Sequence, residues 1–352
     1  MDNLTHSLVG FTLVRAGLGR RTPGTMPAML IASNAPDLDI VTAITGGAVP
    51  YLEAHRGPTH GILGVLLLAV GTAILVAVAQ RIGSGMKDPE RRGSVKSLLV
   101  VALVGTVLHV LMDLPTSYGT RLLSPFSETW FAFDWLPIVD VYLWALLIGG
   151  VAVARGWPGA RATIARAVLV LAIVFYGGRA YAHQRALAHA TLSRADGVQQ
   201  PCAIAPTLTR HPASIDAARF SPGQCLQAAA LPTFLSPLRW QLIRQYPNGY
   251  ELRQHSVSAL TDEDQLWVAN ESDVWITAAE QTWTARVFLK FSRMPARRSV
   301  VLPDGSHQVR LIDVRFVGGP FQFRRDPEMR PPFVATIILS PRGKVLAERL
   351  GQ

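Results

Sequence analysis

The sequence predicts an α-helical membrane domain followed by a β-rich soluble domain. The 352 residues are 49% hydrophobic and only 16% charged, which is too apolar for a uniformly soluble chain of this length. The apolar stretches lie before about residue 180, and strand-like alternation dominates after it. We therefore expect a transmembrane helical domain at 1–182, a linker helix at 183–196 and a β-rich domain at 197–352.

Two short apolar segments, Leu4–Val14 and Met26–Ala35, open the chain and are joined by an arginine-rich turn. Both are shorter than the ~20 residues needed to cross a hydrocarbon core of ~30 Å. We expect a short helical hairpin, and its length leaves open whether it re-enters the membrane or packs against longer helices. The first segment includes His6 and follows Asp2 instead of a basic stretch, so no cleavable signal peptide is expected.

About four longer stretches are expected to cross the membrane. They are Gly61–Gln80, Leu98–Leu114, Ile138–Ala154 and Thr163–Tyr181. Arg and Lys gather in the loops after the first and third of these, and the positive-inside rule places those loops in the cytoplasm. The chain is then a multi-pass protein of a bacterial-type inner membrane whose C-terminal domain is extracytoplasmic.

The net charge of +10 is distributed over short loops and the C-terminal region. No single stripe of basic residues with interleaved aromatics is present, so we expect no nucleic-acid partner. Basic residues beside apolar spans attract anionic head groups, so the expected partners are membrane lipids.

The C-terminal region has the composition of strands and turns. The expected strands include Gln265–Asn270, Asp273–Thr277, Ala285–Phe291, Gln308–Phe316 and Phe333–Leu339, with turns at 303–305 and 341–343. The two cysteines, Cys202 and Cys225, lie in this region, where a disulfide can form. On spacing alone, a disulfide and two separate buried thiols are equally open.

Four polar islands interrupt the apolar half. They contain Asp2 with His6, Asp37 with Asp39, His55 with His60, and His109 with Asp113. An ionisable group beside hydrocarbon costs at least a few kcal/mol, so a set of this size is expected to face a cavity and form a site. Helix capping explains any single member but explains the whole set less well. With the basic loops inside, all four islands reach the outer membrane face.

The spacings favour a divalent metal. His109 and Asp113 are four residues apart, so they lie on one face of a helix. Imidazoles and carboxylates without thiolates favour zinc, and more than four candidate ligands suggest two ions. The expected metal ligands are Asp2, His6, Asp37, His55, His60, His109 and Asp113.

Three residues near these ligands are candidates for catalytic roles. Asp37 or Asp39 is expected to position a metal-activated water or accept its proton. Arg56 offers donors to an anionic substrate group, although loop capping or head-group contact is equally open.

These motifs resemble the YdjM-type family of membrane-bound metal-dependent hydrolases. The resemblance rests on Met-Asp-x-x-Thr-His at the start, Pro-Asp-x-Asp from Pro36, His-Arg-Gly-x-Thr-His from His55, and His-x-x-x-Asp-x-x-Thr-x-Tyr-Gly from His109. It covers about the first 150 residues. The pattern is also similar to that of the zinc-dependent phospholipase C and single-strand nuclease superfamily, which implies His6, Asp37, His55 or His60, His109 and Asp113 as ligands.

The resemblance implies a zinc-dependent hydrolase that cleaves a phosphoester, with a lipid or envelope-associated molecule as a possible substrate. No further His/Glu pair follows Asp113 in the membrane region, so a third metal is not expected. The alternative is a metal-binding membrane protein without turnover that acts in envelope maintenance or stress response. A transporter is disfavoured because the polar residues cluster at one face instead of tracing a path through the spans.

Overall fold

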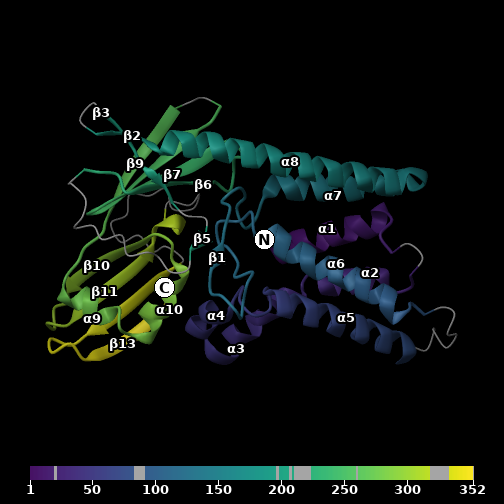
Figure 1. The fold of residues 1–352 in the computed structure, drawn as a ribbon, viewed down its shortest axis with the longest axis horizontal. Helices are drawn as coiled ribbons and strands as arrows, with labels where there is room; N and C mark the ends of the chain where they lie inside the picture. The colour runs from purple at the N-terminus through teal and green to yellow at the C-terminus, as the bar shows by residue number, and fades with distance from the viewer. Residues whose placement is uncertain are drawn as a thin grey trace. The chain divides into compact units, whose positions relative to one another are not determined.

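The computed structural model describes residues 1–19, 22–82, 92–195, 198–205, 208–209, 223–258, 261–317 and 333–351. It divides into two compact units, Met1–Val41 with His55–Arg179, and Thr42–Ala54 with Ala180–Gln352. The first unit is helical and the second contains the large sheets (Figure 1). The expected fold class is confirmed.

The N-terminal hairpin consists of α1 (Asn3–Ala16) and α2 (Thr25–Ala32). Helix α1 ends at Gly17, whose φ of 122° is accessible to glycine and whose amide bonds to the carbonyls of Leu13 and Val14. The two helices pack closely at Gly10, where a Cβ would come within 2.6 Å of the Ser33 hydroxyl. This close packing brings the end of α2 against the first turns of α1.

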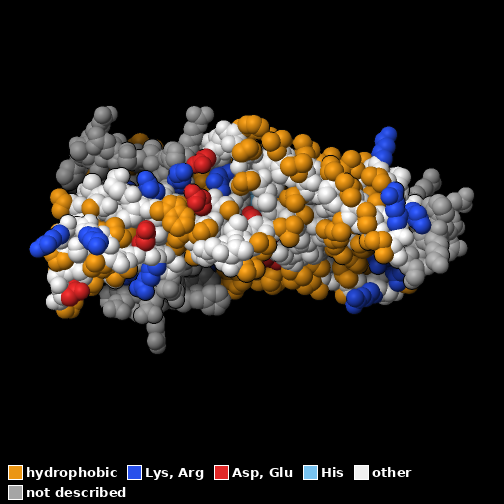
Figure 2. Space-filling model, turned by 90° about the horizontal axis from the view of Figure 1, so that it is seen from below, with side chains coloured by type: hydrophobic (Ala, Val, Ile, Leu, Met, Phe, Trp, Pro, Cys, Tyr) orange, Lys and Arg blue, Asp and Glu red, His pale blue; other side chains and the backbone are white. Residues whose placement is uncertain are grey.

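Within the described ranges, three segments are long and apolar enough to cross a membrane: α5 (Ile62–Ile82), α6 (Val95–Asp113) and Pro158–Ala190, which comprises η3 (Pro158–Ala160) and α8 (Arg161–Ala190). Helix α7 (Val141–Gly156) is apolar but has only 16 residues, or about 24 Å. The expected four crossings therefore correspond to three long helices and one shorter helix. Hydrophobic side chains cover the visible face of the helical unit, with Lys and Arg gathered near one end (Figure 2).

The remaining short elements are η1 (Ala35–Ile40), α3 (Val41–Gly46), α4 (Ala48–Ala54) and β1 (Trp130–Phe131). Inside the helical unit, α7 and α8 pack on α1 and α6 through a cluster that includes Leu136, Leu143, Leu147 and Val168. Burial of these apolar side chains stabilises the packing of the helices. The polar side chains at one end of α1 and α6 form a separate cluster.

The second unit contains two main sheets. A five-stranded sheet has the order β4-β6-β7-β8-β9, and a four-stranded antiparallel sheet has the order β10-β11-β12-β13. The strands are β2 (Leu192–Ala195), β3 (Val198–Pro201), β4 (Ala203–Ile204), β5 (Leu208–Thr209), β6 (Gln227–Pro232), β7 (Arg239–Tyr246), β8 (Gly249–Ser256), β9 (Thr261–Ala269), β10 (Pro295–Val301), β11 (His307–Asp313), β12 (Val334–Leu339) and β13 (Val345–Leu350). The expected turns at 303–305 and 341–343 connect β10 to β11 and β12 to β13. A short η5 (Val314–Phe316) follows β11.

Two expected strands are helices, so those predictions are wrong. Residues 274–277 lie in α9 (Val274–Ala279), directly after its N-cap Asp273, and residues 285–291 lie in α10 (Trp283–Phe291). The side chains of Asp273 and Thr282 cap the two helices by accepting from backbone amides. Helix α10 buries Thr284, Ala285, Val287, Phe288 and Phe291. This spacing of three or four is that of an amphipathic helix.

The expected linker helix at 183–196 is also corrected. Helix α8 continues without a break to Ala190, and residues 192–195 form β2. The buried side chain of Arg244 explains this end, because it donates to the carbonyls of His189, Ala190 and Leu192. Arg244, from β7, thus donates to backbone carbonyls at the end of α8 that would accept from backbone amides if the helix continued for another turn.

Cys202 and Cys225 form a disulfide, with Cα atoms 5.1 Å apart. The two residues are buried in a cluster with Trp240 and Leu242. The structure therefore decides between the two alternatives that spacing left open.

Candidate metal centre

The polar islands converge at one end of the helical unit. His6 lies in α1, Asp37 and Asp39 lie in η1, His55, Arg56 and His60 lie between α4 and α5, and His109 and Asp113 lie in the last two turns of α6. The residues thus come from four different segments of the chain. The packing of α2 on both α1 and α6 brings these segments together.

Asp37, His60, His109 and Asp113 form one group that could hold a metal ion. The Nε2 atoms of His60 and His109 are 3.2 Å apart. Each Nε2 lies 3.4 Å from Asp113 Oδ2, and Asp37 Oδ1 lies 3.5 Å from His60 and 3.6 Å from His109. A tetrahedral zinc ion with bonds of ~2.0–2.1 Å separates its ligand atoms by about 3.3–3.4 Å. Five of the six distances among these four ligand atoms, at 3.2–3.6 Å, are therefore close to those of a tetrahedral site.

The protonation of the two histidines suits this role. His109 Nδ1 lies 2.7 Å from the carbonyl oxygen of Ser33, so Nδ1 carries the proton and Nε2 keeps its lone pair. Burial lowers the pKa of His60 to about 3, so this imidazole is neutral at physiological pH. Two imidazole nitrogens that face each other beside two carboxylates fit a shared cation.

A second group consists of Asp37, Asp39 and His55, so Asp37 belongs to both groups. His55 Nδ1 lies 2.9 Å from Asp39 Oδ1. Asp39 Oδ2 accepts from the backbone amide of Arg56 at 2.9 Å and from the Thr59 hydroxyl at 3.2 Å. A carboxylate shared by two ligand groups is the arrangement found when two ions are bridged.

Both aspartates of η1 are ionised. Burial alone would raise the pKa of the Asp37 carboxyl, but the imidazoles of His109 and His60 outweigh it and hold this pKa well below its usual range. Burial also acts to raise the pKa of Asp39, and the His55 imidazole reverses the effect, so the net shift is downward. Two charged carboxylates in partly buried positions favour a cation between them.

His6 lies beside these groups but belongs to neither. Its ring stacks on that of His109 with centroids 3.8 Å apart, and its Nε2 lies 3.5 Å from Asp113 Oδ1. The side chain is 1% exposed, and neither ring nitrogen has a hydrogen-bond partner among the described residues. A buried imidazole with two unsatisfied nitrogens costs free energy unless a ligand is bound. The amino group of Met1 also contacts Asp113.

Asp2 has a different place from the one expected. Its carboxylate caps α1 by accepting from the Thr5 amide at 3.0 Å and from the Thr5 hydroxyl at 2.6 Å. It is in neither of the two ligand groups. A helix N-cap accounts for this residue, as it also does for Asp140 at the start of α7.

Arg56 holds the ligand Asp113 in place. Its Nη2 lies 3.1 Å from Asp113 Oδ1, and its Nη1 donates to the Thr116 hydroxyl and the Gly119 carbonyl. The backbone of Arg56 has a φ of 53°, in the left-handed region. With this backbone conformation, the Arg56 amide donates to Asp39 while the Arg56 guanidinium contacts Asp113. The structure thus assigns Arg56 to positioning two carboxylates, a role that sequence spacing did not indicate.

A family model described as YdjM inner membrane protein matches residues 1–186, which include every residue of both ligand groups. A protein described as "Uncharacterized protein YfhP" from Bacillus subtilis (strain 168) is 32% identical over 171 residues. That alignment covers 45% of this chain and 48% of the relative, so the chain spans about half the length of the curated protein it matches. No solved structure matches.

Proposed function

We propose that this chain, which belongs to the YdjM inner membrane protein family, is a membrane-embedded hydrolase that uses zinc to cleave a phosphoester. One observation carries the proposal. The facing Nε2 atoms of His60 and His109 lie with Asp37 and Asp113 at the spacing of a tetrahedral site, and Asp37 is shared with a second ligand group.

Bound divalent ions would supply an activated water and neutralise charge on the phosphoryl group. In the hydrolysis, the water oxygen forms a bond to phosphorus, the ester P–O bond breaks, and the leaving alkoxide takes a proton. Asp39 is suited to orient the water and accept its proton, because Arg56, Thr59 and His55 fix both of its oxygens. Arg56 holds Asp113 in place through its guanidinium, which is a positioning role.

An amphiphilic substrate is supported by the segment that carries the aspartates. Leu38 and Ile40 alternate with Asp37 and Asp39 along η1, and their side chains are 58% and 48% exposed. A segment that points carboxylates inward and large apolar side chains outward suits a substrate with a phosphate and a hydrocarbon part. We therefore favour a lipid or another envelope-associated phosphoester.

We further propose that the second unit is extracytoplasmic, in an inner membrane that the chain crosses several times. The disulfide between Cys202 and Cys225 supports this location, because disulfides persist in oxidising compartments. The basic loops support it through the positive-inside rule. A reporter that is active only in the cytoplasm should be inactive when fused to the C-terminus. Activity of this fusion would contradict the proposed orientation.

The function is tested on the full chain purified in detergent. We expect bound zinc by elemental analysis, and hydrolysis of phospholipid or of bis-(p-nitrophenyl) phosphate. His109→Ala should lose both, whereas the matched control His307→Gln, in the sheet unit, should keep both. Absence of metal in the wild-type protein would contradict the proposal. Bound metal without turnover of any phosphoester would favour the non-catalytic metal-binding alternative.

A further inference from the structure

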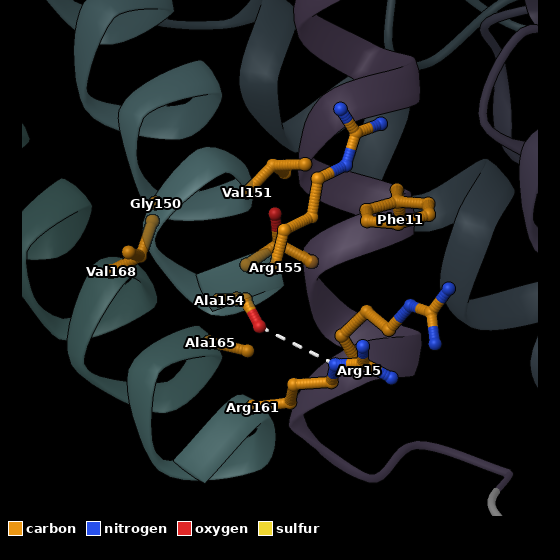
Figure 3. A pocket seen from close by; sticks show the side chains of 10 residues that line it. Phe11, Arg15, Gly150, Val151, Ala154, Arg155, Arg161, Ala165 and Val168 are labelled. Atoms are coloured by element: carbon orange, nitrogen blue, oxygen red, sulfur yellow. Dashed lines mark hydrogen bonds between the residues drawn. The ribbon is translucent and has the colours of Figure 1, made fainter. Parts of the chain in front are cut away.

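A cavity of about 340 Å³ lies in the helical unit away from the metal centre. It is enclosed by the last turns of α1 and α7 and the first turns of α8 (Figure 3). The first turns of α1 and α7 lie at the other end, where Trp144 donates to Thr5 one residue before His6. Arg155 lies 15 residues after Asp140, a rise of about 22 Å along the helix, so the cavity and the metal centre lie at opposite ends of these helices.

The cavity combines apolar walls with three arginines, one from each helix. The walls include Phe11, Val151, Ala154, Ala165 and Val168. The arginines are Arg15, Arg155 and Arg161. Arg15 lies over the Phe11 ring at 4.9 Å, and Arg161 Nε donates to the Ala154 carbonyl at 3.3 Å. Figure 3 shows that the three side chains reach the pocket from different elements.

No acidic residue compensates these charges within the lining helices. The sequences of α1, α7 and α8 contain neither Asp nor Glu. In the described ranges, none of the three arginines forms an ion pair. Three guanidinium groups around one apolar-walled cavity therefore attract an anion that has a hydrocarbon part.

The position of the cavity along the helices favours a lipid as the source of this anion. Trp157 lies between Arg155 and Arg161 in sequence and is 68% exposed. Exposed tryptophan beside arginines at the end of apolar helices is typical of the membrane interface, and the basic end is the cytoplasmic one by the positive-inside rule. Anionic lipids give that surface its negative potential.

We propose that this cavity binds the phosphate head group of an anionic glycerophospholipid in the cytoplasmic leaflet. The arginines contact the phosphate oxygens, and the apolar wall contacts the glycerol and the upper acyl chains. The site is separate from the metal centre, so it neither requires nor excludes the proposed hydrolysis.

The test is native mass spectrometry of the full chain in detergent with added phosphatidylglycerol or phosphatidylcholine. We expect the wild-type protein to retain phosphatidylglycerol preferentially. The double variant Arg155→Gln/Arg161→Gln should bind it more weakly by about fivefold for each arginine removed. Ala154→Phe, which fills the cavity and leaves every charge in place, should also lose the preference.

Arg81→Gln is the matched control, because Arg81 lies in the last turn of α5, another helix end, and does not line the cavity. It should keep the preference, and an equal loss in this variant would overturn the proposal in favour of general surface charge. Inorganic phosphate is added in a separate arm, and complete displacement of the lipid by millimolar phosphate would identify a free-anion site instead. An unchanged melting temperature and helical circular dichroism signal in each variant show that the helical unit is folded.

Discussion

The Nε2 atoms of His60 and His109 face each other at 3.2 Å, although the two residues are 49 positions apart in the chain. The Nδ1 of His109 carries the proton of its ring, so its Nε2 presents a lone pair toward His60. A cation between the two rings would accept this lone pair together with one from His60 Nε2. The relationship between these two residues is the basis for the predictions about the metal centre.

Removal of the metal is expected to destabilise the protein. Without a cation, Asp37 and Asp113 remain as neighbouring carboxylates in a buried site. A ligand present at about 100 times its dissociation constant contributes ~2.7 kcal/mol, so a chelator should lower the melting temperature by several degrees. Added zinc should restore it. A melting temperature that is insensitive to both treatments would rule out a structural contribution from metal.

Gly61→Ala is expected to weaken metal binding at least tenfold. A Cβ at Gly61 would come within 2.0 Å of the carbonyl oxygen of Ser124, so the backbone beside His60 must move. Gly71→Ala, inside helix α5 that begins directly after Gly61, is the control, because a Cβ there has no atom within 4 Å. Zinc titration of both variants checks the prediction, which fails if the two bind zinc equally.

Arg56→Gln should reduce zinc affinity by about 10–100-fold, the usual range for partners that orient metal ligands. The substitution removes the contact of the guanidinium with Asp113 at 3.1 Å and leaves that carboxylate less well held. Arg253→Gln is the control, since Arg253 pairs with Glu251 at a partly exposed position and should change stability by less than ~1 kcal/mol. If Arg56→Gln keeps wild-type zinc affinity and activity, Arg56 has no positioning role.

The metal-free protein is expected to lose stability as the pH falls. Burial lowers the pKa of His60 to about 3, whereas in the unfolded chain it is about 6.5. Between these values the unfolded state binds the extra proton, so the free energy of unfolding decreases by up to ~1.4 kcal/mol per pH unit. Thermal melts of the chelated protein from about pH 7 to pH 5 measure this slope. His60→Gln should show a shallower one.

Replacing both cysteines by serine should destabilise the sheet unit by about 3 kcal/mol. The disulfide between Cys202 and Cys225 closes a loop with a sequence separation of 23, and chain entropy assigns a loop of this size a contribution of that order. Zinc content should not change, because both candidate ligand groups found among the described residues lie in the helical unit. Loss of zinc in the Cys202→Ser/Cys225→Ser variant would show that the two units depend on each other.

The helical part of the fold was predictable because its signal is local. Long apolar stretches and basic loops identify membrane helices without any tertiary information. Helices α5 and α6 begin and end near the expected positions, and α8 begins near its expected start but continues past Tyr181 to Ala190. In the sheet unit, short apolar runs suit either a strand or a buried helix. For α9 and α10 the capping side chains of Asp273 and Thr282 and the packing of Phe288 decided for helix.

The sequence by itself determined the membrane character of the first half, the type of side chains that meet there and the pairing of His109 with Asp113 on one helical face, because each depends on composition or on a fixed helical period. Only the tertiary structure decided which carboxylates face the imidazoles. It set Arg56 against Asp113 and used the backbone carbonyl of Ser33 to orient His109. Contacts between residues tens of positions apart depend on how helices pack, and a backbone carbonyl is present at every residue. Neither kind of contact can therefore be predicted from the local sequence pattern.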